Sequence, residues 1–221
     1  MRNPTILRLL AAALVLTLTS ACSALRPTAS EQPAFYSLDN ARLDAPGAPA
    51  EMPKAAPAAA TLIVNPPQAA SGFKSQRIVY VRTAHQLEYY AHSEWIDPPA
   101  HMIAPLIVAA LESRGRFRAV ILTPSVAAGE LRLDTEIIRL QRELASAPSR
   151  VRLTLRAYLV DNATRQVLSW REFDESVAVA SEDPHGAVVA ANRATPVVLG
   201  KLADFCADAA TQWQPAADQQ R

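Results

Sequence analysis

Glycine, cysteine and histidine are scarce in this chain of 221 residues, which has six glycines, two cysteines and four histidines. The phosphate-binding patterns GxGxxG and GxxxxGK[ST] are absent, which excludes the nucleotide-binding loops that they form. The GxSxG nucleophile turn, the HExxH metal helix and the CxxC pair are absent as well. A pair of carboxylates brought together by the fold stays open, because such pairs have no sequence signature. We therefore predict a protein that is not an enzyme and that holds no metal.

An excess of positive charge is also lacking, because 22 lysines and arginines stand against 21 aspartates and glutamates. Residues 1–21 contain two of the arginines and no acidic residue, so the rest of the chain has 20 basic and 21 acidic side chains. Binding to nucleic acid requires a basic surface that neutralises phosphates. A nucleic-acid partner is therefore excluded.

The chain has no apolar run of the about 20 residues that a membrane-spanning helix requires. It begins instead with Arg2 and Arg8, a short apolar segment at 9–18, and the sequence Leu-Thr-Ser-Ala-Cys, which ends at Cys22. This order is typical of an export signal, and its end is similar to a bacterial lipobox, where cleavage leaves the cysteine for a lipid. We predict a signal peptide at 1–21 and lipidation of Cys22. The alternative is an ordinary signal peptide that contains a cysteine by chance.

Lipidation uses one of the two cysteines, so Cys206 is left without a partner for a disulfide. We expect Cys206 to be a small buried thiol of the core. Ser23 follows Cys22, and lipoproteins without an aspartate at this position are usually sorted to the outer membrane. The predicted location is the periplasmic side of the outer membrane of a Gram-negative bacterium. The covalent lipid, with acyl chains such as palmitate, is the one attached group that we expect.

Two stretches rich in alanine, proline and polar residues interrupt the N-terminal part of the chain. Residues 22–34 are predicted to be a tether, and residues 40–60, which lack an apolar period, to be a mobile loop. The domain itself is predicted at 35–213, a length that allows one stable hydrophobic core. Residues 214–221 are predicted to be a flexible tail.

The rest of the sequence alternates between strand and helix patterns. Strands are predicted at 35–38, 61–64, 77–82, 85–95, 117–122, 130–140, 151–160 and 166–179. A change of phase through Ile138 and Leu140 predicts a β-bulge. Asp97 and Asp183 each precede a proline, which predicts two helix starts with aspartate as N-cap, and the second helix is expected to continue through Pro196. This order predicts an α+β fold with one mostly antiparallel twisted sheet and two main helices packed on one of its faces.

The stretch YYAHSEW at residues 89–95 holds the densest group of aromatic side chains. It could form a ligand site, a metal site or part of the core. In a strand with a period of two, Tyr89 and Trp95 point into the core, and Tyr90, His92 and Glu94 point outward. We predict that these three outward residues bind a protein partner.

These features together resemble a known family: the lipobox, an early Tyr-x-Leu at 36–38, the segment GFKSQRIVYVRTAHQLEYYAHSEWIDPP at 72–99, and a helix that ends as LESRGRFRAV at 111–120. The resemblance is to the auxiliary lipoproteins of ABC-type transport systems, of the kind that includes paraquat-inducible protein C. It extends from Cys22 to about Trp213, and the segment 72–120 is its most specific part.

The resemblance implies a periplasmic component of a lipid transporter that accompanies a mammalian-cell-entry (MCE) substrate-binding protein. Two functions stay open within it. In the first, the domain docks the MCE protein and positions it at the outer membrane. In the second, the domain is a carrier that binds lipid in a groove between sheet and helices. We expect docking, because the apolar residues of the sequence are accounted for by a single core.

Overall fold

The computed structural model describes residues 32–39 and 59–214. Apart from Gln32, these residues belong to one compact unit that begins at Pro33. The signal peptide, Cys22 and most of the predicted tether, loop and tail lie outside the described residues. Those boundaries stay predictions.

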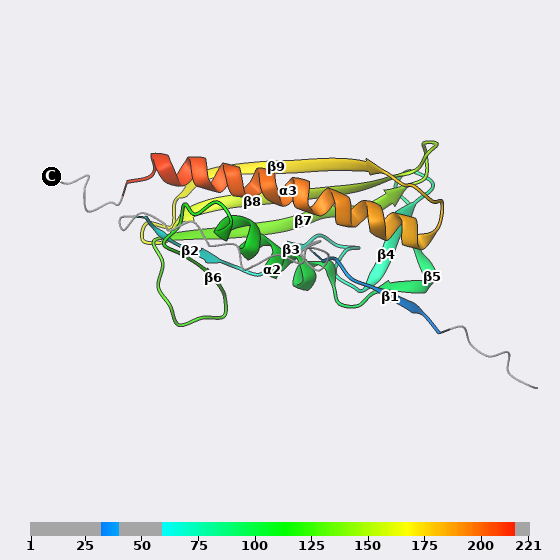
Figure 1. Ribbon diagram of the computed structural model, residues 1–221, viewed down its shortest axis with the longest axis horizontal. Helices are drawn as coiled ribbons and strands as arrows, with labels where there is room; N and C mark the ends of the chain where they lie inside the picture. Colours follow the sequence, from blue (N-terminus) through cyan, green and yellow to red (C-terminus); the bar gives the residue numbers. More distant parts are fainter. Residues whose placement is uncertain (1–31, 40–58, 215–221) are drawn as a thin grey trace, which may run out of the picture. The chain divides into compact units, whose positions relative to one another are not determined.

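The described strands form one sheet around the long strand β7 (Leu131–Glu143) (Figure 1). On one side, β7 pairs with β8 (Arg150–Asp161), which pairs with β9 (Val167–Ala178), and both pairings are antiparallel. A tight turn between β8 and β9 makes them a hairpin, as the sequence predicts. Strand β9 pairs with β8 alone, so it is an edge strand of the sheet.

The other side of β7 is shared by three short strands that follow one another along it. These are β2 (Thr61–Val64), β3 (Gln68–Ala69) and β4 (Arg77–Val81), and each pairs with β7 in parallel. Strand β2 also pairs in parallel with β6 (Ala119–Leu122). Because short connecting segments separate β2, β3 and β4, the three strands together pair with β7 from its first residues to its last.

The edge beyond β4 is formed by two strands that are distant in sequence. Strand β5 (Glu88–Trp95) is antiparallel to β4, and β1 (Ala34–Tyr36) is parallel to β5. The predicted short strand near residue 35 is therefore confirmed. Its partner is a strand that follows more than fifty residues later in the chain.

The α+β class is confirmed, but the prediction of a mostly antiparallel sheet is wrong, because the sheet is mixed. Apart from the pair of β1 and β5, the parallel pairings join strands before α2 with strands after it, and a crossover through a helix returns the chain in its earlier direction. The pattern of a single strand indicates its two faces but does not indicate the direction of its neighbour.

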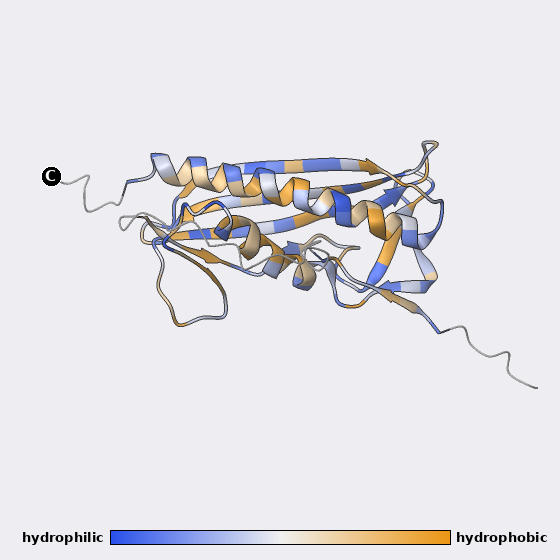
Figure 2. Ribbon diagram, in the orientation of Figure 1, coloured by the Kyte–Doolittle hydropathy of each residue, from blue (hydrophilic) through white to orange (hydrophobic). Residues whose placement is uncertain are grey.

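Two helices, α2 (Pro99–Glu112) and α3 (Pro184–Gln212), contribute to one core with the sheet. Figure 2 shows polar and apolar residues alternating in bands along α3, and its apolar residues belong to this core. The core includes Leu133 and Ile137 of β7 and Leu202 of α3, each fully buried. Cys206 is also buried in it as a free thiol, and burial raises its pKa to about 12. The prediction of a core thiol is confirmed.

The two helix starts differ from one another. Asp183 is the N-cap of α3, where its carboxylate accepts a hydrogen bond from the Gly186 N–H at 2.6 Å, as predicted. The predicted cap of α2 by Asp97 is wrong, because the N-cap position is Pro98 and no side chain caps that end. The Asp97 carboxylate lies instead 3.1 Å from Nδ1 of His101, one helical turn onward.

The predicted bulge in β7 is confirmed by a register shift against β8 between Ile137 and Arg139. Away from this bulge, the residues of β7 and β8 alternate between the core and the opposite face of the sheet. That opposite face carries one ion pair within β7, Arg132–Asp134, and four between neighbouring strands. The four are Arg156–Glu136, Arg156–Glu172, Arg152–Glu143 and Arg152–Asp174.

Candidate partner-binding surfaces

Strand β5 contains the three residues predicted to bind a partner, and the structure corrects the orientation of one of them. Trp95 is buried in the core, as predicted, but Tyr90 also packs against the core. The register between β4 and β5 shifts between Arg77 and Val79, so β5 does not alternate regularly along its length. Tyr89 is half-buried, and the Arg77 guanidinium lies over its ring. The prediction that Tyr90 points away from the core is therefore wrong.

The hydroxyl of Tyr90 belongs to a polar cluster around Arg142, a residue of β7 that is only 3% exposed. The Arg142 guanidinium donates to the Tyr90 hydroxyl at 2.9 Å, to the Ser149 hydroxyl at 2.8 Å and to the Asp183 carbonyl at 3.2 Å. It also forms an ion pair with Glu182. The cluster thus joins β5, the end of β7 and the first turn of α3. Each of the three guanidinium nitrogens therefore has an acceptor, which offsets the cost of burying the charge.

The cluster changes the pKa of two of its members. Burial raises the pKa of Tyr90, against the opposing effect of the bond from Arg142. The pKa of Glu182 is lowered, first by the Ser149 backbone N–H that donates to its carboxylate and then by the Ser149 hydroxyl. Tyr90 is therefore protonated and Glu182 ionised at neutral pH, which is the pairing that the Arg142 guanidinium requires.

His92 and Glu94 lie farther along β5, where His92 is exposed and Glu94 is half-buried. Glu94 is flanked by Arg77 of β4 and by Phe35 of β1, its partners in the sheet. Phe35 and Ile96 each remain 55% exposed beside it. We call this region, made of β1, β5 and the last residues of β7, the β1 end of the sheet.

The opposite end of β7 lies beside the turn that joins β8 to β9, and we call this region the hairpin end. Asp161, the last residue of β8, accepts hydrogen bonds from the backbone N–H groups of Ala163 and Thr164 at 2.9 and 2.8 Å. Its second oxygen accepts from the indole N–H of Trp213 at 2.8 Å, at the C-terminal end of α3. These bonds, with the Thr164 N–H first, lower the pKa of Asp161.

The first residues of β9 expose large apolar side chains at the hairpin end. Trp170 is 60% exposed and Val167 is 55% exposed. On the face of the sheet that carries the ion pairs, the Trp170 ring stacks on Tyr158 of β8, with 6.4 Å between ring centroids and 27° between their planes. An exposed tryptophan that is held in place in this way is a frequent anchor of protein interfaces, because little entropy is lost when a partner covers it.

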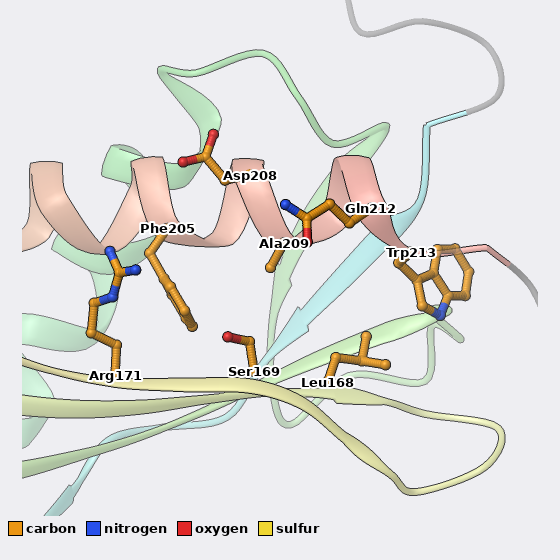
Figure 3. A pocket seen from close by; sticks show the side chains of 8 residues that line it. All are labelled: Leu168, Ser169, Arg171, Phe205, Asp208, Ala209, Gln212 and Trp213. Atoms are coloured by element: carbon orange, nitrogen blue, oxygen red, sulfur yellow. The ribbon is translucent and has the colours of Figure 1, made fainter.

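A pocket of about 360 Å³ lies on the helix side of β9 at the hairpin end. Figure 3 shows Ser169 and Arg171 of β9 facing Phe205 and Ala209 of α3, with Trp213 at one side. The Arg171 guanidinium lies over the Phe205 ring, 5.1 Å from its centroid. The lining therefore mixes charged, polar and aromatic groups.

Two residues of these surfaces were not found from the sequence. Trp170 lies within a predicted strand, but the sequence did not show which of its faces the helices cover. Arg142 follows the bulge in β7, and its burial depends on contacts with residues 52 and 40 positions away, Tyr90 and Glu182. No sequence pattern marked either residue.

Within residues 32–39 and 59–214, no group of His, Cys, Asp and Glu side chains is arranged to hold a metal ion. In the same part of the chain, neither α2 nor α3 is both long and apolar enough to span a membrane.

Residues 42–203 match the family model described as the ABC-type transport auxiliary lipoprotein component. The chain belongs to this family. The match covers most of the sequence, including β2 to β9, α2 and α3 as far as Ala203, and it confirms the resemblance found in the sequence. The family's members are auxiliary components of bacterial transport systems and are not a known family of enzymes. No curated protein sequence matches this auxiliary lipoprotein.

Solved structures support the fold of the auxiliary lipoprotein. A crystal structure of a Xanthomonas campestris protein of the DUF330 family is similar with a TM-score of 0.68 and 21% identity, over 85% of this chain and 99% of that one. A crystal structure of an uncharacterised protein is similar with a TM-score of 0.60 and 13% identity, over 80% of this chain and 99% of that one. At these identities the similarity concerns the fold.

Proposed function

We propose that this auxiliary lipoprotein is anchored to the outer membrane through Cys22 and docks the MCE substrate-binding protein of an ABC-type lipid transporter there. The family match supports a role beside an ABC transporter. The observation that carries the docking role is Trp170, an aromatic ring that is 60% exposed although it is fixed by Tyr158. The ion pairs around it satisfy their own charges, so the ring is the part of this face that gains from being covered.

The proposed docking surface is therefore the face of β8 and β9 at the hairpin end, with Trp170 as its aromatic anchor. Tyr90 is less suited to this role than the sequence suggested, because its hydroxyl is bonded to Arg142 and its ring packs at a tilt against the Tyr80 ring. His92 and Glu94 stay candidates for a second partner contact at the β1 end.

The alternative, a carrier that holds lipid, is favoured less by the geometry. The pocket beside Arg171 has about 360 Å³, near the lower limit of about 300 Å³ for sites of drug-sized ligands. A phospholipid with two acyl chains is larger and needs an apolar lining, whereas this pocket presents Arg171, Asp208 and Gln212. The apolar side chains of sheet and helices instead contact one another in the core.

The test is capture of the MCE protein by the full auxiliary lipoprotein in detergent. Trp170→Ala is expected to weaken the affinity by about tenfold or more, as for the loss of an interface anchor. Val197→Ala, which changes an exposed apolar residue of α3, is the matched control and is expected to leave the affinity unchanged. Equal affinity for both variants and the parent chain would remove Trp170 from the interface.

Native mass spectrometry of the same preparation separates docking from carriage. Docking predicts a complex with the MCE protein and a chain that carries no lipid beyond the covalent anchor. A second, non-covalent lipid that copurifies with the chain in the absence of the MCE protein would support the carrier instead.

A further inference from the structure

Two exposed apolar side chains at the β1 end share one face of the sheet. Phe35 pairs with Glu94 across β1 and β5, and Ile96 lies two residues beyond Glu94. Ile96 lies one residue past the end of β5, but its N–H donates to the Tyr36 carbonyl and so continues the pairing with β1. Its side chain is therefore on the same face as those of Glu94 and Phe35. Tyr36 and Trp95 form the next pair and point to the core side. The two exposed residues thus lie on the face that the helices do not cover.

This face is held firmly although it lies at the edge of the sheet. The Ile96 N–H donates to the Tyr36 carbonyl at 2.7 Å. Asn192 of α3 accepts from the Asp39 N–H at 2.9 Å and donates to the Ser37 carbonyl at 3.0 Å. Leu38 is buried between these contacts. The exposure of Phe35 is therefore a property of an ordered strand, and an ordered apolar group in water is disfavoured unless something covers it.

The position of Cys22 in the sequence indicates what covers this face. Phe35 follows Cys22 by 13 residues, and a chain of that length spans at most about 45 Å when fully extended. A lipid on Cys22 thus keeps the β1 end near the bilayer. The hairpin end lies at the other end of β7, which separates it from the anchored edge.

We infer that Phe35 and Ile96 contact the headgroup layer of the membrane in which Cys22 is anchored, so that the β1 end faces the bilayer. This inference rests on the proposed lipid anchor. The charges near the pair have both signs, with Arg77 and Glu94 facing each other across β4 and β5. The contact therefore depends on apolar side chains that enter the interface and needs no excess of anionic lipid. The hairpin end and Trp170 are then left free for a partner that comes from the periplasm.

Thiol-specific fluorescent probes test this orientation on the full acylated chain. Cys206 is fully buried and its pKa is raised to about 12, so it does not compete for the label, and an acylated Cys22 has no free thiol. Phe35→Cys and Ile96→Cys place the probe on the proposed contact. Val167→Cys is the matched control, because Val167 has the same exposed fraction of 55% at the hairpin end.

The labelled chains are reconstituted into vesicles of phosphatidylethanolamine and phosphatidylglycerol that contain a lipid with a nitroxide on its headgroup. The nitroxide is expected to quench the probes at 35 and 96 several-fold more strongly than the probe at 167. Equal quenching at the three positions, or stronger quenching at 167, would overturn the inference.

Two further outcomes also decide against it. Probes at 35 and 96 that are shielded from iodide in the water but are not quenched by the lipid would mean that protein covers this face, which fits the partner contact predicted for His92 and Glu94. A chain that stays in the aqueous phase during reconstitution would show that Cys22 carries no lipid. Capture of the MCE protein in detergent is measured separately, so failure of the docking function is distinguished from failure of the membrane contact.

Discussion

The β1 end and the hairpin end each hold one terminus of α3 through a buried ionic residue, but they do so with opposite charges. At the β1 end, the Arg142 guanidinium bonds to the Asp183 carbonyl at the N-terminus of α3 and to the side chains of Tyr90, Ser149 and Glu182. At the hairpin end, the Asp161 carboxylate accepts from the Trp213 indole at the C-terminus of the helix. The comparison shows that a helix of 29 residues is positioned by polar contacts at both of its ends as well as by its apolar face.

The two ends also differ in the apolar groups that they expose. The β1 end exposes Phe35 and Ile96, and Phe35 follows the predicted lipidation site, Cys22, by 13 residues in the sequence. The hairpin end exposes Val167 and Trp170 on an edge strand. Both ends thus expose apolar surface. We propose that a membrane covers it at the β1 end and that a protein partner covers it at the hairpin end.

The tryptophans at the two ends give the largest expected difference. Trp95 is 3% exposed, and Trp95→Ala is expected to lower the free energy of unfolding by about 3–5 kcal/mol, because it removes core contacts and leaves a cavity. Trp170→Ala is expected to change it by no more than about 0.5 kcal/mol. Urea unfolding of the two variants measures both values. Similar losses would mean that the Trp170 ring is part of the stable structure.

The ionic residue of the β1 end is tested by Arg142→Met, which keeps most of the apolar stem. The change leaves the Ser149 hydroxyl and the Asp183 carbonyl without their donor, and we expect a loss of about 2–4 kcal/mol. Arg139→Met on the same strand is the control, since Arg139 is half-exposed and has no such cluster. A loss at position 142 no larger than the loss at 139 would show that the buried cluster adds nothing to stability.

At the hairpin end, Asp161→Asn places an amide group against the Trp213 indole, where two donors then meet. At neutral pH we expect a loss of about 1.5–3 kcal/mol, the range for a hydrogen bond to a charged group. The pKa of Asp161 is lowered in the folded state, so its contribution is present above the unfolded pKa of about 3.9 and is lost as the pH falls through the folded pKa. The difference between variant and parent should therefore shrink in acid. A difference that is independent of pH would exclude the carboxylate as its source.

Tyr90→Phe is expected to give the smallest change among the buried polar contacts, a loss of about 0.5–1.5 kcal/mol for the one hydrogen bond to Arg142. Because its ring stays in place, capture of the MCE protein should be unaffected, in contrast to Trp170→Ala. Calorimetry and the capture assay, run side by side, measure the two effects. If a Tyr90→Phe chain of normal stability no longer bound the MCE protein, the interface would include Tyr90 of β5, as the sequence predicted.

The sequence predicted those features that depend on local periodicity. The bulge after Ile137 and the burial of Trp95 follow from the spacing of apolar and polar residues, and the cap at Asp183 follows from the proline after it; all three are confirmed, as is the core position of Cys206. The lipid on Cys22 stays a prediction.

Features that depend on distant neighbours could not be predicted in the same way. A period of two indicates which residues share a face, but the alternation is interrupted where the register shifts between β4 and β5, and Tyr90 rather than Tyr89 packs against the core. The parallel pairing of β2 with β6 depends on the crossover through α2. Arg142 resembles an ordinary strand arginine in the sequence, because its acceptors come from elements before and after it.

The place of β7 in the sheet also affects the order in which the chain can fold. Strands β2, β3 and β4 all pair with β7. Leu62 of β2, for example, pairs with Leu131, which follows it by 69 positions in the sequence. The hairpins of β7, β8 and β9 close short loops, so they form at a smaller entropic cost than the parallel pairs. A chain that is exported from its N-terminus therefore leaves β3 and one edge each of β2 and β4 without a partner until β7 has followed. Such edges associate readily with other chains, so this interval is when a periplasmic chaperone would be of most use to the protein.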